Sequence, residues 1–188
     1  HTEKIITSQR HRIIAVGRLV VLKGFDILIN AFSLVADNFP DWDLFILGEG
    51  EYRLELEKLI TKLNLNSRVL LPGLVNDPFS YLQNSDIFVS SSHHEGLPMS
   101  MCEAMTCKLP ILATNSSSGV RELLDEGNAG ILVERNDVSA LSTALNQLMT
   151  DTTIRNKYGE LAYNRVQKYN IENIIPQWET LFSIINIH

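Results

Sequence analysis

Four charged side chains in two separate segments could act together on an anion and on hydroxyl groups. Arg18 and Lys23 follow an apolar run and lie beside glycines. Two cations over a strand end suit an anion, and phosphate fits best. Glu95 and Glu103 flank a predicted helix start. Ionised carboxylates would repel a phosphate that they touched, so they suit sugar hydroxyl groups as acceptors.

The predicted helix start would add a second group that attracts anions. We expect the helix to begin near Pro98, because proline suits the first helical turn and lacks only a donor that would be unpaired there. The free N–H groups of Met99 and Ser100, together with the helix dipole, would form an anion site. That site would face the same crevice as Arg18 and Lys23.

Each of these groups also has an ordinary interpretation, which the residues leave open. Arg18 and Lys23 could be solvated surface cations, and glutamates are common near helix starts. Gly48 and Gly50 could serve only a tight turn. No G-x-G-x-x-G follows the first apolar run, so the dinucleotide-binding fingerprint is absent.

The elements that would position these groups alternate along the chain. Six short, continuously apolar runs are typical of strands buried on both faces, and amphipathic stretches of helical period separate them. The runs are 12–16, 43–47, 68–71, 86–90, 110–114 and 130–134. The alternation predicts an α/β fold, a Rossmann-like, doubly wound, six-stranded parallel sheet with helices on both faces. Ligands of such sheets bind beyond the carboxyl ends of the strands, where all the candidate residues lie.

Two more helices are expected at the end of the chain, over 152–169 and 171–185. The second has an apolar stripe, and Pro176 should kink or restart it. The stripe would pack on this domain's own sheet or on a second domain outside the sequence. The expected parts are a tail or expression remnant at 1–9, a ligand-binding domain at 10–170 and a closing helix at 171–188.

Composition limits the possible functions. The 188 residues suffice for one domain with its own core, and 45% apolar with 20% charged residues argues against disorder. A net charge of −6 makes a poor nucleic-acid binder, and no apolar run approaches the roughly 18–20 residues of a membrane span. Cys102 and Cys107 lie on different faces of a predicted helix, so we expect no disulfide and a reducing, cytosolic compartment. The chain begins with His1, and we expect it to be a piece of a longer protein.

Four segments, taken together and in order, resemble the motifs of one enzyme family. The run from Glu95 to Glu103 resembles the E-x7-E motif of the retaining GT-B glycosyltransferases of family GT4. The segment 17–24, G-R-L-x3-K-G, resembles that family's phosphate clamp. Segments 118–122 and 128–133 lie where members carry G-G-x-x-E and N-G-x-L-V.

The resemblance implies the C-terminal, donor-binding half of a two-domain glycosyltransferase. Arg18 and Lys23 would hold the donor diphosphate with the helix N–H groups, Glu103 would accept from the ribose, and Glu95 would accept from the transferred sugar. The backbone at 96–98 would line the sugar pocket, and residues 73–75 would flank the base. The implied donor-binding residues are Gly17, Arg18, Lys23, Gly73, Val75, Glu95, Gly96, Leu97, Pro98, Met99, Ser100 and Glu103. Of these, Glu95, Arg18 and Lys23 would also be catalytic.

The implied reaction fits the charges. Cleavage at the anomeric carbon builds negative charge on the departing diphosphate, and Arg18 and Lys23 would stabilise it without a metal or another cofactor. Glu95 would help electrostatically, because the sugar develops positive charge. No general base is assigned, since the departing phosphate oxygen itself could take the acceptor proton.

The expected partners follow from the same resemblance. A UDP-sugar is the favoured donor. The N-terminal half would bind a glycan or lipid-linked glycan acceptor, in surface polysaccharide synthesis for example. The closing helix would return to that half. The whole protein would be cytoplasmic and would work at the inner face of the membrane as a peripheral protein.

Three residues depart from the family pattern. Members usually carry glycine where Lys108 stands, which puts the turn before the fifth strand in doubt. Ser118 replaces the first glycine of the G-G pair, and Arg121 replaces a frequent proline. The last two lie near the expected donor sugar and leave its identity open.

Other interpretations remain. Asp41 and Asp43 form a D-x-D of the kind that binds metal in GT-A transferases, but they lie at the edge of the sheet opposite the crevice. Adjacent His93 and His94 point apart and suit a surface or pocket wall better than a metal site. Alternative functions are another sugar-nucleotide enzyme such as an epimerase or phosphorylase, a non-catalytic nucleotide-binding module, and an oxidoreductase.

Overall fold

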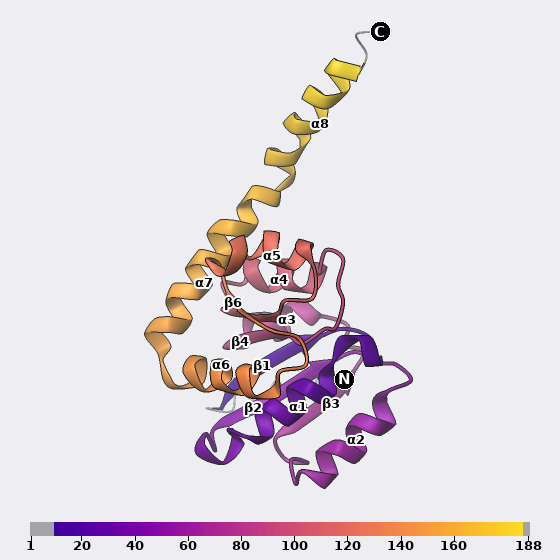
Figure 1. Ribbon diagram of the computed structural model, residues 1–188, viewed down its shortest axis with the longest axis vertical. Coiled ribbons are helices and arrows are strands. Elements are labelled where there is room, and N and C mark those ends of the chain that lie inside the picture. Colours follow the sequence, from indigo (N-terminus) through magenta and orange to yellow (C-terminus); the bar gives the residue numbers. More distant parts are fainter. Residues whose placement is uncertain (1–9, 186–188) are drawn as a thin grey trace.

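The computed structural model describes residues 10–185, built around a six-stranded parallel sheet (Figure 1). The tail expected at 1–9 lies outside the described residues. The strands run in the order β3-β2-β1-β4-β5-β6. Their bounds are β1 His11–Val16, β2 Trp42–Leu47, β3 Val69–Gly73, β4 Ile87–Ser90, β5 Ile111–Thr114 and β6 Ile131–Val133. All six predicted strands are confirmed, with small shifts at their ends.

The strand order reverses between β1 and β4, which lie side by side at the centre of the sheet. Ile13 pairs with Ile87, and Ile14 pairs with Phe88. In a doubly wound sheet, the point where the order reverses is where the loops diverge to opposite faces and leave a crevice. The loops that follow β1 and β4 therefore meet at one place.

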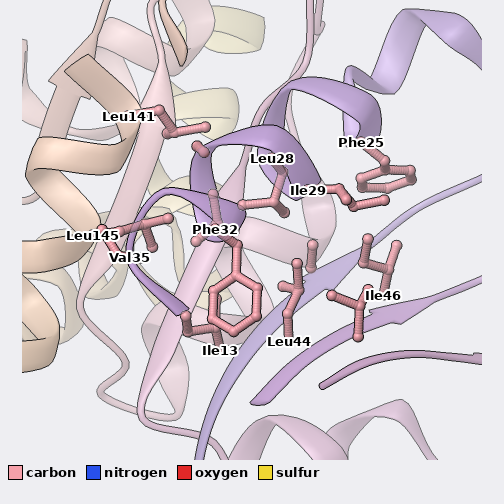
Figure 2. Close-up of a cluster of buried hydrophobic side chains, with 14 of the residues drawn as sticks. Ile13, Phe25, Leu28, Ile29, Phe32, Val35, Leu44, Ile46, Leu141 and Leu145 are labelled. Carbon is pink, nitrogen blue, oxygen red and sulfur yellow. The ribbon is translucent and has the colours of Figure 1, made fainter. Parts of the chain in front are cut away.

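Helices cover both faces of the sheet. One face carries the helices α1, α2 and α6, and the other carries α3, α4, α5 and much of α7. Their bounds are α1 Phe25–Ser33, α2 Arg53–Lys62, α3 Pro78–Gln83, α4 Met99–Thr106, α5 Ser118–Leu123, α6 Val138–Thr150 and α7 Thr152–Val166. Figure 2 shows the first core, where Phe32 and Leu28 of α1 lie against Ile13, Leu44 and Leu145.

Local capping explains where several helices begin. Asp77, Ser117, Asp137 and Asp151 each accept a hydrogen bond from a backbone N–H in the first turn of the following helix. Such a cap pairs a donor that the helix itself leaves free. These four side chains fix the starts of α3, α5, α6 and α7.

Helix α8, Ile171–Ile185, extends away from the body (Figure 1) and has no buried residue. The interpretation that it packs on this domain's own sheet is wrong, because both faces are already covered by the other helices. The helix also runs through Pro176 without restarting, since proline removes one backbone donor while the flanking turns keep theirs. None of the helices between residues 10 and 185 has the length and apolarity needed to cross a bilayer.

Candidate functional site

The loops after β1 and β4 are joined by an ion pair between two predicted site residues. Lys23 Nζ lies 2.5 Å from Glu95 Oε1, and the Ser92 hydroxyl donates to the same oxygen at 2.6 Å. The side chains of Lys23 and Glu95 are 22% and 12% exposed. The structure thus brings the expected phosphate-binding cation and the expected sugar-binding carboxylate into direct contact.

Backbone contacts hold the two loops together. The Ser91 hydroxyl donates to the Lys23 carbonyl at 3.0 Å, and the His93 N–H donates to the Leu22 carbonyl at 2.9 Å. Gly24 has φ +59°, and a Cβ there would lie 2.3 Å from the Ser91 carbonyl oxygen. Only glycine permits both this conformation and this close approach. The position of Lys23 is therefore fixed by main chain on both sides.

A cavity of about 180 Å³ opens beside this pair, at the ends of β1, β2 and β3. It is lined by Gly17 and Arg18 after β1, and by Gly73, Leu74 and Val75 at the end of β3. Arg18, which is expected to hold the diphosphate, and residues 73–75, which are expected to flank the base, therefore line one cavity. Its mostly apolar lining suits a flat ring rather than a charged group.

Gly17, which lines the cavity, also packs closely against the Lys23 side chain. A Cβ on Gly17 would lie 3.3 Å from Lys23 Cε, and a Cβ on Gly48 would lie 1.9 Å from the Gly17 carbonyl oxygen. Gly48 has φ +137°, so it combines a close approach with a conformation that favours glycine. Gly48 therefore does more than make a tight turn, because a glycine at this position lets the ends of β1 and β2 lie close together.

Glu49 also lines the cavity, although no sequence motif predicts a role for it. Its carboxylate accepts two hydrogen bonds from Arg53, at 2.6 and 2.8 Å. These hydrogen bonds lower the pKa of Glu49, so the group stays ionised with its charge offset by Arg53. The i,i+4 spacing of Glu49 and Arg53 was the available signal for this pair.

Helix α4 begins beside the same strand end. The Ser100 hydroxyl donates to the Val16 carbonyl at 3.3 Å, and Val16 also lines the cavity. Within residues 10–185, no protein acceptor pairs with the N–H groups of Met99 and Ser100. Pro98 is the N-cap and not part of the first turn, a correction of one position that follows from its extended ψ of 93°. The expected pair of free donors is present.

Arg18 and Glu103 are exposed, and neither side chain has an ion pair or hydrogen bond within the described part of the chain. Arg18 lines the cavity. Glu103 shares one helical face with Met99 and Ser100 through its i,i+4 and i,i+3 spacing, but no contact joins it to Lys23 or Glu95. Its predicted ribose contact stays a prediction.

The sugar-side loop is open. Gly96 and Leu97 are exposed, and a Cβ on Gly119 would lie 2.8 Å from the Gly96 carbonyl oxygen. Ser118, which departs from the family pattern, is the first residue of α5, so this helix begins directly beside the sugar-side loop. Arg121, the other departure there, donates to the Asn115 side chain at 3.0 Å.

The third departure, Lys108, adopts the conformation that glycine would take. Its φ is +59°, and its carbonyl packs against Gly159 of α7, where a Cβ would lie 2.2 Å away. Lys108 Nζ lies 2.8 Å from Glu160. The turn before β5 is therefore preserved with lysine in it.

The D-x-D segment lies at the amino end of the sheet and is paired internally. Arg10 and Arg68 both donate to the carboxylate of Asp43. Because its carboxylate is already paired with these two arginines, Asp43 has a structural role. His93 lies against Gly24 while His94 is exposed. These positions agree with the expectation that the two histidines lie in a pocket wall or on the surface.

The two cysteines are free and half-buried. Burial raises the pKa of both thiols. Cys102 and Cys107 pack beside the core on the α4 side of the sheet.

Comparison with known proteins decides the family. The sequence model of the family described as "Glycosyl transferases group 1" matches residues 2–165. The chain belongs to this glycosyltransferase family. An uncharacterized glycosyltransferase of Haemophilus influenzae is 32% identical over 94% of the chain and 50% of its own length, so the chain spans about half of that relative.

Solved structures agree with this glycosyltransferase assignment. The C-terminal domain of the group 1 family protein LpcC from Francisella tularensis is similar with a TM-score of 0.79 and 28% identity, over 86% of this chain and 87% of that one. A mutant of S. aureus TarM, in complex with fondaparinux, alpha-GlcNAc-glycerol and UDP, is similar with a TM-score of 0.85 and 28% identity, over 92% of this chain and 35% of that one. The fold of this chain matches that of the C-terminal half of a GT-B glycosyltransferase.

Proposed function

We propose that this chain is the donor-binding half of a retaining, metal-independent glycosyltransferase that uses a nucleotide-diphosphate sugar. The observation that carries the proposal is the meeting of Lys23 and Glu95 at the reversal of strand order, beside Arg18 and the free N–H groups of α4. A UDP-sugar is the favoured donor, and the UDP bound by the TarM relative supports that choice.

The diphosphate would lie between the positive groups. Arg18, Lys23 and the N–H groups of Met99 and Ser100 would donate to its oxygens. The base would enter the cavity at Gly73–Val75, where the apolar lining suits a ring. Gly17 permits the donor to approach the backbone.

The carboxylates would bind the hydroxyl groups of the donor. Glu95 would accept from the transferred sugar, with Gly96, Leu97 and Pro98 lining its pocket, and Glu103 would accept from the ribose. A carboxylate accepts several hydrogen bonds and donates none, which suits a polyhydroxylated ring.

In the proposed reaction, the acceptor oxygen forms a bond to the anomeric carbon while the bond from that carbon to the diphosphate breaks. The electron pair goes to the departing phosphate oxygen, which also takes the acceptor proton on the same face of the sugar. Fixed cations stabilise the developing negative charge more than the ground state, so no metal or other cofactor is required. The TarM mutant binds alpha-GlcNAc-glycerol together with UDP, and an alpha linkage is what a retaining enzyme would make from an alpha-linked donor.

The acceptor would be a glycan or lipid-linked glycan, bound by an N-terminal half onto which the apolar stripe of α8 would dock. Exposed residues of that stripe include Trp178 and Phe182, which are 53% and 54% exposed. We place the whole protein in surface polysaccharide synthesis, in the cytoplasm at the inner face of the membrane.

The test is a transfer assay with the full-length protein and a panel of UDP-sugars, GDP-sugars and NAD. We expect transfer from a UDP-sugar, a product that keeps the donor's anomeric configuration by NMR, and no loss of activity with EDTA. Binding of NAD without any nucleotide-diphosphate sugar would refute the transferase proposal and favour the oxidoreductase. Binding of a UDP-sugar without transfer to any acceptor would favour a binding module.

A further inference from the structure

We propose that Ser92 is a positioning residue that holds the Glu95 carboxylate in place when Lys23 turns to the donor. The inference rests on the proposed function, in which Lys23 binds the diphosphate and Glu95 binds the sugar. It concerns a residue that the motifs do not single out.

The Ser92 hydroxyl is well placed for this role. Ser92 is only 2% exposed, and its Oγ donates to Glu95 Oε1 at 2.6 Å. Its own carbonyl accepts from the buried Thr114 hydroxyl at 2.6 Å, so the last residue of β5 fixes the position of the serine main chain. A buried donor with a fixed backbone orients its acceptor more firmly than a surface side chain does.

The bond leaves one carboxylate oxygen for the substrate. Ser92 and Lys23 both donate to Oε1 of Glu95. In the described part of the chain, Oε2 accepts no hydrogen bond. The serine therefore fixes the orientation of the carboxylate through one oxygen while the other is available to a sugar hydroxyl.

Donor binding would change the partners of Lys23 but not those of Ser92. A diphosphate carries more negative charge than a carboxylate, so it attracts the lysine. Glu95 then loses its cation and keeps the serine. Without the Ser92 hydroxyl, the carboxylate would rotate freely in the step where its position matters most.

The experiment is a double-mutant cycle in the full-length enzyme with Ser92→Ala, Glu95→Ala and the pair together. We expect Ser92→Ala to lower kcat about 10- to 100-fold, as for the loss of one charge-assisted hydrogen bond, while the Kd for UDP changes less than about twofold. Since Ser92 acts through the Glu95 carboxylate, the serine substitution should cause no further loss in the Glu95→Ala background, where its acceptor is gone.

Two further variants separate positioning from folding. Ser92→Thr keeps the hydroxyl and should retain most of kcat. Ser85→Ala removes a serine hydroxyl bond to the Tyr81 carbonyl just before β4, at the amino end of the sheet, and should leave kcat unchanged. Two results would overturn this inference and leave the proposed function standing. One is a loss of kcat from Ser92→Ala that is equal in the wild-type and the Glu95-substituted backgrounds, and the other is an unchanged kcat in Ser92→Ala. A wild-type enzyme that binds no nucleotide-diphosphate sugar would overturn the proposed function as well.

Discussion

The two ends of the same parallel sheet each carry a charged cluster, and the clusters differ in what they leave unpaired. At the amino end, Asp43 accepts from Arg10 at 2.6 and 2.7 Å and from Arg68 at 3.2 Å. Arg68 also donates to the carbonyls of Trp42, Phe39 and Ala36. Protein atoms satisfy this carboxylate from both sides.

At the carboxyl end, the pairing is incomplete. Lys23 and Glu95 pair with each other, but Arg18 is exposed and the first N–H groups of α4 have no acceptor in the described residues. Glycines at this end let the loops pack closely against one another. On our proposal, the ion pair surrounded by unpaired donors and glycines belongs to a binding site, whereas the one surrounded by backbone carbonyls has a structural role.

The largest expected effect is on transfer, at the carboxyl end. Glu95→Gln in the full-length enzyme removes the negative charge beside the reacting sugar and should lower kcat about 100- to 1000-fold. Glu55→Gln, which alters an exposed glutamate paired with Lys58, is the control. Initial-rate assays would show the difference, and equal activity of both variants would remove Glu95 from the site.

The next effect is on stability, at the amino end. Asp43→Ala leaves Arg10 and Arg68 without their shared partner and should lower the free energy of unfolding by about 2–4 kcal/mol. Donor affinity of the folded protein should not change. Urea denaturation together with calorimetric titration would check both. Weaker donor binding at unchanged stability would show that the two ends do not divide their roles as proposed.

A smaller loss is expected for the cations of the crevice. Lys23→Ala and Arg18→Ala should each weaken nucleotide-diphosphate binding by about 1–3 kcal/mol, because each removes charge-assisted hydrogen bonds. Lys62→Ala, an exposed lysine on α2, should bind as the wild type does. Calorimetric titration with UDP measures all three, and unchanged affinity in both crevice variants would dismiss the clamp.

The smallest effect concerns Lys108, before β5 at the amino end. Lys108→Gly relieves the positive φ of +59° but loses an exposed ion pair to Glu160. The free energy of unfolding should rise by up to about 1 kcal/mol, with donor affinity unchanged. Thermal denaturation would test this, and a clear loss of stability would mean that the lysine itself holds the turn.

The sequence predicted the sheet well because its four inner strands are largely buried on both faces and therefore read as continuous apolar runs, whereas the edge strands β3 and β6 are partly exposed. The runs at 43–47 and 110–114 show this pattern, and the strands appear there. Placing the candidate residues at one edge followed from the parallel topology. The direct contact of Lys23 with Glu95 did not follow, because it depends on β1 lying next to β4.

Other features depended on three-dimensional packing that no local pattern encodes. Ser92 is one of three consecutive serines, and what distinguishes it from the other two is the hydrogen bond of its hydroxyl to Glu95. The exposure of α8 depended on which helices had already covered the sheet. Lys108 keeps a glycine conformation because Gly159 packs against its carbonyl, a contact between residues far apart in the sequence.

The most direct test of the central claim is a crystal structure of the protein with an intact UDP-sugar. We expect the diphosphate within hydrogen-bond distance of Lys23 Nζ and the N–H groups of Met99 and Ser100, with Lys23 turned from Glu95 to the diphosphate and the Glu95 carboxylate facing the sugar. A nucleotide bound at another edge of the sheet, or a Lys23–Glu95 pair that stays intact beside the bound donor, would contradict it.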